Sequence, residues 1–191
     1  MKPKILLSFL LVFTFHLQIH AQLSNLSDEF DDATTIENWN IHTSGPLAAN
    51  YYETLILNDS LIEGAALVNA PLQHLTLIPG PGHCGWYANT MGSLLYKMVE
   101  GNFSVTTYVS VQNKNDLGNA PTSNYNSAGL LIRDPDTEGN ENCIMCNLGF
   151  QSYSNGVGTE TKNTDDGIST LYLNPDEGEG WLRICRVGNI F

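Results

Sequence analysis

The stretch AGLLIRDPDTEGNENCIMCNLGFQ, residues 128–151, carries the pattern that decides the fold. Its two ends, Gly129–Asp134 and Asn142–Gln151, are short runs whose residues divide into two alternating sets. A period of two is that of a β-strand, because successive side chains of a strand point to opposite faces. Pro135–Glu141, between the runs, is rich in residues that favour loops. The stretch therefore predicts two strands joined by a loop.

Three further segments alternate in the same way: Phe103–Gln112, Ile168–Leu173 and Trp181–Val187. Helical periodicity is poor along the whole chain, whereas clusters of Gly, Asn, Asp and Pro separate the short runs. Each predicted strand has an aliphatic face and a face rich in polar and aromatic groups. The aliphatic faces are Phe103, Val105, Val109 and Val111, with Thr107 among them; Ile144, Cys146, Leu148 and Phe150; Leu171 and Leu173; and Leu182 and Ile184. We expect them to form the core between two sheets of an all-β antiparallel sandwich.

Four cysteines, Cys84, Cys143, Cys146 and Cys185, would pair as disulfides in an exported protein, with three connectivities open. Cys143 and Cys146 form a CxxC, which is typical of a redox pair or of half of a zinc site. The second half is missing, and the motif lies in a strand rather than at the start of a helix. The alternation places Cys143 and Cys185 on outward faces, so a cross-strand bond between them requires their strands to be neighbours.

Several of these segments resemble a known family. DEFDDATTIENWN (28–40), AGLLIRDP (128–135) with ENCIMCNLGFQ (141–151), and GWLRICRVGNIF (180–191) are similar to segments of concanavalin A-like lectin/glucanase domains. These laminin-G-like domains are common in secreted multidomain proteins of Bacteroidota. The resemblance implies a jelly roll of two antiparallel sheets with one concave face. It does not imply a reaction, because the fold hosts lectins, carbohydrate-binding modules, adhesion domains, glycosidases and lyases.

The resemblance also implies that the strand ending at Phe191 would continue, so we expect the domain at 22–191 to be incomplete at its C-terminal end. The chain would then be part of a larger multidomain protein.

Residues 1–21 have the layout of a secretory signal peptide. Lys2 and Lys4 precede an apolar run over Ile5–Phe15, and the small residue Ala21 precedes Gln22. The run is about half of what a membrane-spanning helix needs. We expect cleavage after Ala21, no membrane insertion after that cleavage, and a secreted or cell-surface location.

The chain is strongly acidic. It has 8 Lys and Arg against 20 Asp and Glu, and removal of the two lysines of the signal peptide leaves 6 − 20 = −14. Such a charge repels phosphate backbones, so nucleic acid is not expected as a partner. Anionic membranes and polyanionic glycans are disfavoured for the same reason, and a neutral glycan remains compatible.

Catalytic motifs are weak in this sequence. A glycosidase needs two carboxylates flanking the scissile bond, and the nearest match is the segment EFDDAT (29–34), which lacks the final Glu of the E-x-D-x-x-E pattern. No G-x-S-x-G or phosphate-binding glycine loop occurs. Oxygen ligands for Ca²⁺ are available at Asp28, Asp31 and Asp32 or at Asp165 and Asp166, without a binding-loop motif. We therefore predict no catalytic residues, no metal site and no cofactor.

Binding is the better-supported class of function. Sugar recognition uses aromatic rings for the C–H face of a pyranose and planar amide or guanidinium groups for its hydroxyls. The outward faces carry such groups, and the predicted ligand-binding residues are Tyr108, Arg133, Asn147, Gln151, Tyr172 and Arg183. Trp181 belongs to the same outward set unless it is a buried anchor at the start of its strand. The alternative is that these positions belong to two sheets and face different ways. A glycoside hydrolase or lyase of the same fold, and a structural or adhesion domain that binds protein, are the rival functions.

Overall fold

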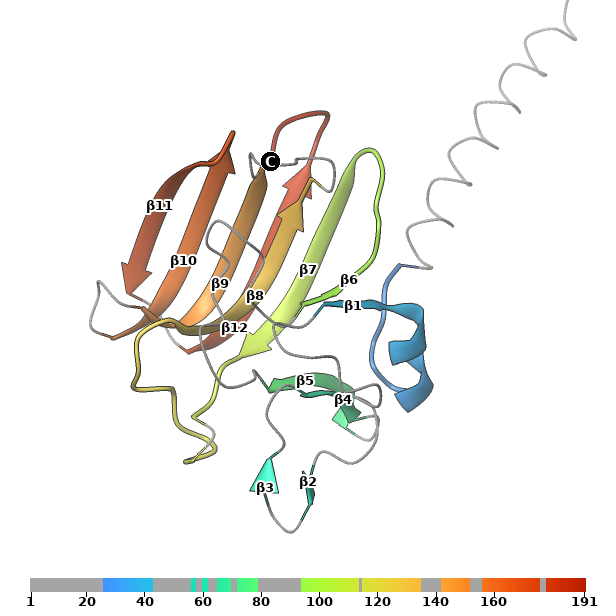
Figure 1. The fold of residues 1–191 in the computed structure, drawn as a ribbon, viewed down its shortest axis with the longest axis vertical. Helices are drawn as coiled ribbons and strands as arrows, with labels where there is room; N and C mark the ends of the chain where they lie inside the picture. The colour runs from blue at the N-terminus through green and yellow to red at the C-terminus, as the bar shows by residue number, and fades with distance from the viewer. Residues whose placement is uncertain are drawn as a thin grey trace, which may run out of the picture. The chain divides into compact units, whose positions relative to one another are not determined.

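The computed structural model describes residues 26–42, 56–57, 60–61, 65–69, 72–78, 94–113, 115–134, 142–151, 156–175 and 178–191. Contacts between residues divide the chain into two compact units. The first comprises residues 1–84 and 91–98, and the second comprises residues 85–90 and 99–191. Figure 1 shows the ribbon with the labels of its strands.

The first unit contains one short 3₁₀ helix and three small antiparallel pairs of strands. These elements are η1 (Ala33–Asn38), β1 (Asn40–His42) paired with β6 (Leu94–Tyr96), β2 (Ile56–Leu57) paired with β3 (Ser60–Leu61), and β4 (Ala65–Asn69) paired with β5 (His74–Ile78). The helix begins where the side chain of Asp32 accepts a hydrogen bond from the backbone N–H of Thr34, which is a common N-cap. Ile36 of the helix is buried against Leu75 and Leu95.

The opening segment of this unit is held by the carboxylate of Asp28. Its Oδ1 accepts a hydrogen bond from the backbone N–H of Phe30, and its Oδ2 accepts one from Nε1 of Trp39, each at 2.8 Å. The rings of Phe30 and Trp39 stack with centroids 5.9 Å apart. The ammonium of Lys97 lies 4.4 Å from the centroid of the Trp39 ring, a cation–π contact. The Asp-x-Phe…Trp pattern therefore has a structural role.

The second unit consists of two antiparallel sheets. The larger has the order β11-β10-β9-β8 and the smaller is the pair β12-β7. Their bounds are β7 (Phe103–Ser110), β8 (Asn126–Arg133), β9 (Cys143–Gln151), β10 (Gly156–Asp165), β11 (Ile168–Pro175) and β12 (Glu179–Arg186). The two strands predicted within residues 128–151 are confirmed as β8 and β9, and the structure pairs them antiparallel with Leu130 opposite Cys146.

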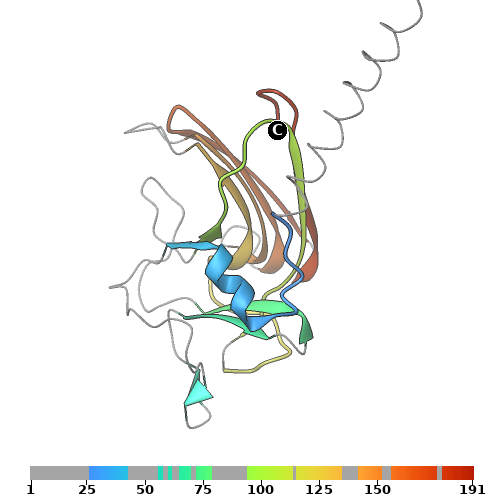
Figure 2. The same cartoon turned by 90° about the vertical axis from the view of Figure 1, so that its right-hand side faces the viewer.

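The two sheets of this unit pack face to face. Strand β12 packs on β9 and β8. Figure 1 draws β12 behind the four-stranded sheet, and Figure 2 shows the same strands from the side. Leu182 and Ile184 of β12 are buried, as is Leu148 of β9. A Cβ atom built at Gly180 would lie 3.6 Å from Cδ1 of Leu148, so the Leu148 side chain points at β12. The predicted all-β antiparallel fold is confirmed, and this packing is that of a β-sandwich.

We call the face of the four-stranded sheet that carries Leu148 its inner face and the opposite side its outer face. The cross-strand pairs show which residues of β8, β10 and β11 lie on each face, because residues directly opposite each other share a face. The prediction for β11 was wrong on this point. Leu173 pairs with Glu160, which pairs with Asn147, so Leu171 and Leu173 lie on the outer face and not between the sheets.

The cysteines also differ from expectation. No disulfide joins Cys143, Cys146 and Cys185 to one another, so the cross-strand bond that neighbouring strands would have allowed between Cys143 and Cys185 is not formed. Strand β12 pairs with β7, whereas β9 pairs with β8 and β10, so the two strands are not neighbours. Cys143 and Cys146 point to opposite faces of β9 and cannot ligate one ion together. Cys84 lies outside the described residues.

The predicted signal peptide at residues 1–21 also lies outside the described residues. In the part of the chain that the structure describes, no helix has the length and apolar character to cross a membrane.

The close approach of β8 and β9 requires glycine at position 129. A Cβ atom there would lie 2.6 Å from Cα and 2.8 Å from Cβ of Asn147. We expect Gly129→Ala to destabilise the chain by about 2 kcal/mol through overpacking, which lowers Tm by about 4–8 °C for a chain of this size. Thermal unfolding followed by circular dichroism measures the change.

Gly180→Ala is the matched control, because its new methyl group meets one side-chain atom at 3.6 Å, an ordinary contact. Equal Tm values for Gly129→Ala and the unmodified chain would contradict this prediction, because they would show that β8 and β9 can move apart without a loss of stability.

Candidate functional site

The structure distributes the predicted ligand-binding residues over three surfaces of the second unit. Tyr108 and Arg183 lie on the exposed face of the β12-β7 pair. Arg133 and Asn147 lie on the outer face of the four-stranded sheet, and the position of Gln151 on β9 belongs to that face by alternation. Tyr172 is exposed on the edge strand β11 and faces the opposite way from Asn147. The six residues therefore do not form one face, which agrees with the alternative that the sequence left open.

The exposed face of the β12-β7 pair presents two neighbouring aromatic rings. Trp181 is directly opposite Tyr108 in the ladder, and their rings meet edge to face with centroids 5.4 Å apart. Trp181 is 72% exposed and Tyr108 is 49% exposed, so Trp181 is not a buried strand anchor. We call Tyr108, Trp181 and Arg183 the aromatic platform. Two adjacent, solvent-exposed aromatic rings are characteristic of binding surfaces.

Polar groups border this platform along the same two strands. The Nε of Arg183 donates a hydrogen bond to Oγ of Ser104 at 2.9 Å, which fixes the guanidinium over β7. Oγ of Ser104 lies 3.3 Å from Sγ of Cys185, and this hydrogen bond, followed by that of Arg183, lowers the pKa of the Cys185 thiol. Desolvation, followed by the negative charge of Glu179, raises the pKa of Tyr108, so its hydroxyl stays protonated and can donate.

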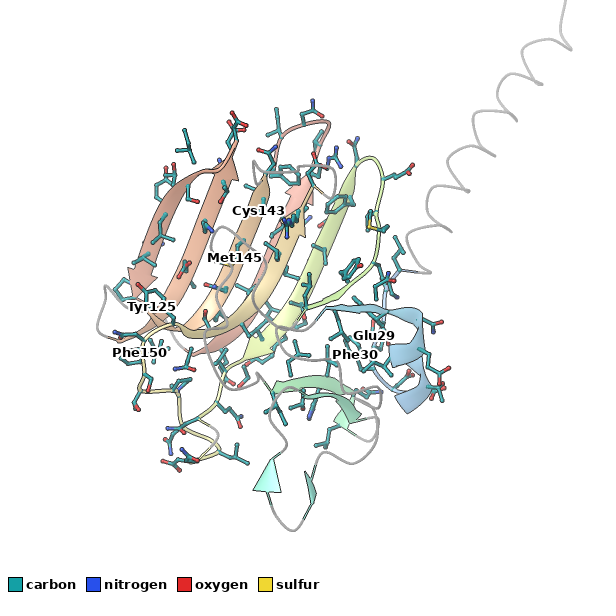
Figure 3. All side chains as sticks on the ribbon, viewed as in Figure 1. Glu29, Phe30, Tyr125, Cys143, Met145 and Phe150 are labelled. Carbon is teal, nitrogen blue, oxygen red and sulfur yellow. The ribbon has the colours of Figure 1, made fainter. Side chains whose placement is uncertain are left out.

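The outer face of the four-stranded sheet carries a second set of polar side chains, which are buried. Asn147 of β9 and Glu160, Lys162 and Thr164 of β10 are each less than 9% exposed. Glu160 is opposite Asn147, Lys162 is opposite Met145, and Thr164 is opposite Cys143. Figure 3 labels Cys143 and Met145, which lie two residues apart along β9. Burial raises the pKa of Glu160, and the positive charge of Lys162 opposes that shift.

Sequence reasoning missed Glu160 and Lys162 because it did not predict β10 as a strand. The segment GVGTETKNTD, residues 156–165, has almost no aliphatic residues. The signal that was present is the alternation of the β-branched Thr159 and Thr161 with Glu160 and Lys162, a pattern typical of a strand.

The first unit has an open groove of 610 Å³ lined by Asp28, Glu29, Asp31 and Lys97 among others. Both oxygens of Asp28 already accept hydrogen bonds within the protein. Among the described residues, no three His, Cys, Asp or Glu side chains gather where they could hold a metal ion.

Comparison of the chain with models of protein families, with curated proteins and with solved structures finds no match.

The buried carboxyl of Glu160 gives stability a specific pH dependence. Its pKa is raised above the ordinary value of 4.5 in the folded chain, so the folded state holds this proton more tightly than the unfolded state. The resulting stability is fully present below pH 4.5 and is lost as the pH rises through the folded pKa. We expect the Tm of the unmodified chain, relative to that of Glu160→Gln, to fall as the pH is raised from 4 towards neutral.

Taking the difference between the two chains at each pH removes the contributions of all other carboxyl groups. Glu100→Gln, at an exposed position of the same unit, is the control. A difference between the unmodified chain and Glu160→Gln that stays constant or grows with pH would contradict the raised pKa.

Proposed function

We propose that this chain is a secreted or cell-surface module that binds neutral carbohydrate without catalysing a reaction. The observation that carries the proposal is the aromatic platform, with Trp181 and Tyr108 exposed on adjacent strands. A pyranose ring has an apolar C–H face that stacks on an exposed aromatic ring, and the flanking guanidinium of Arg183 supplies donors for its hydroxyls.

The charge of the chain supports the same class of ligand. The excess of acidic residues repels polyanionic partners, whereas a neutral glycan is not repelled. The β-sandwich of the second unit is compatible with a jelly roll of the concanavalin A-like type, which we include in the proposal together with the signal peptide. Such a module recognises its ligand through stacking and hydrogen bonds on a preformed sheet surface.

The rival catalytic reading depends on paired carboxylates. In the strands that the structure describes, Glu160 is the one carboxylate on the outer face of the four-stranded sheet. Its raised pKa suits a general acid, and a glycosidase would need a second carboxylate about 5–10 Å away. A test of carbohydrate binding by this chain therefore also has to measure released sugar.

The test is a glycan-array screen of the mature chain with Trp181→Ala and Tyr108→Ala variants. Loss of a stacked aromatic ring is expected to weaken binding at least about tenfold, or about 1.4 kcal/mol. Tyr125→Ala is the control, since Tyr125 is an exposed aromatic residue in the turn before β8 and is not a platform residue. Circular dichroism of each variant verifies the fold.

Binding that survives both platform variants would overturn the role of the platform. Released sugar would establish an enzyme, and the absence of both binding and turnover would favour the structural or adhesion reading.

A further inference from the structure

The aromatic platform offers one ring face on which a sugar ring can stack. The rings of Trp181 and Tyr108 meet edge to face with an interplanar angle of 74°, so they do not form one flat surface. Trp181 is the more exposed of the two, at 72% against 49% for Tyr108. We therefore place the stacked pyranose ring on Trp181, and further contacts have to come from the polar groups along β12 and β7.

The guanidinium of Arg183 is held away from this stacking position. Arg183 follows Trp181 on the same exposed face of β12. Its Nε donates a hydrogen bond to Oγ of Ser104 at 2.9 Å, and Ser104 is directly opposite Cys185, the next residue of that face. At about 3.4 Å per residue, the row of the ladder that contains Ser104 is roughly 13 Å from the row that contains Trp181. The guanidinium therefore points along the ladder, away from the stacking position.

The contacts that fix this guanidinium leave donors available for a ligand. Oγ of Ser104 lies 3.3 Å from Sγ of Cys185, and hydrogen bonds from Ser104 and then from Arg183 lower the pKa of the Cys185 thiol. A guanidinium carries more N–H donors than these two contacts take, and Arg183 is exposed. Its donors form a planar fork whose direction the protein has already set.

Polar groups also occupy the rest of this face. Thr106, which is exposed and directly opposite Arg183, presents a hydroxyl between the row of Trp181 and the row of Ser104. Glu179 is exposed on the far side of Trp181 on the same strand. The hydroxyl donates and accepts hydrogen bonds, and the carboxylate accepts them. A ligand with hydroxyl groups along its whole length therefore meets a partner in each row.

We propose that the aromatic platform takes a linear neutral saccharide of at least two rings, which lies along the ladder of β12 and β7. One ring stacks on Trp181, and the next ring receives hydrogen bonds from the guanidinium of Arg183. A single pyranose ring on Trp181 is too short to reach that guanidinium. Ser104 is a positioning residue, because it acts on the ligand by holding Arg183. This inference rests on the proposed function and adds to it the length and direction of the carbohydrate.

The first experiment compares ligands of different length on the full mature chain by isothermal titration calorimetry. The probes are glucose, cellobiose and cellotriose; glucose, maltose and maltotriose; and N-acetylglucosamine with its β-1,4-linked dimer and trimer. We expect the affinity to rise at least about tenfold from one ring to two in at least one series, because the second ring adds hydrogen bonds to a charged group. Equal affinity for one ring and for two overturns the inference and leaves the proposed function standing. Absence of binding in all three series contradicts the proposed function itself.

The second experiment tests whether Arg183 supplies the gain with length. The measured quantity is the ratio of the disaccharide affinity to the monosaccharide affinity. In Arg183→Ala this ratio is expected to fall about tenfold. In Ser104→Ala the guanidinium keeps its donors and loses its fixed direction, so the ratio is expected to fall about threefold. The double variant is expected to lose no more than Arg183→Ala alone, because Ser104 acts through Arg183.

Ser123→Ala is the matched control, since Ser123 is an exposed serine before β8 and does not belong to this face. It is expected to keep the ratio of the unmodified chain, and circular dichroism verifies the fold of every variant. A ratio that Arg183→Ala leaves unchanged overturns the inference. Losses that add up in the double variant show that Ser104 acts independently of Arg183 and overturn its positioning role.

Discussion

The packing of Leu148 on β12 is the constraint on which the rest of the second unit depends. Because strand side chains alternate, one residue that must face the other sheet fixes the direction of every other residue in the strand. Paired residues of neighbouring strands share a face, so the direction of Leu148 in β9 also determines which residues of β8, β10 and β11 face the other sheet. Leu182 and Ile184 turn inward on the opposing sheet for the same reason, so Trp181 and Arg183 must face solvent. The directions of Asn147 and of the platform residues therefore follow from one hydrophobic contact.

Much of this arrangement could be predicted from the sequence. Alternation alone identified β7, β8, β9 and β12 and sorted their residues correctly into two faces. It failed at β10, which buries Glu160, Lys162 and Thr164 on the outer face. Val157 is the one aliphatic residue of β10, so this strand shows no hydrophobic period. It failed differently at β11. Periodicity shows which residues share a face, but the side on which that face lies depends on strand pairing, which the sequence does not display.

The candidate sites were predictable to a smaller degree. Outward positions of two sheets look alike in a sequence, so residues from three surfaces were grouped as one. The signal at Asn147 was less accessible still, because it depends on register. Only the pairing of β8 with β9 places Gly129 opposite Asn147, and only the three-dimensional packing shows that one atom of its amide is buried without a partner.

The aromatic platform and the outer face of the four-stranded sheet differ in how much their residues affect stability. The aromatic platform consists of exposed side chains, so its residues can be replaced with little effect on the fold. The outer face holds a buried carboxyl whose pKa is raised by desolvation and a buried amide with an unmade hydrogen bond, and both reduce stability. Proteins commonly tolerate such features at functional sites and compensate for them elsewhere. Here two of them are adjacent in one ladder, beside glycines that the backbone requires.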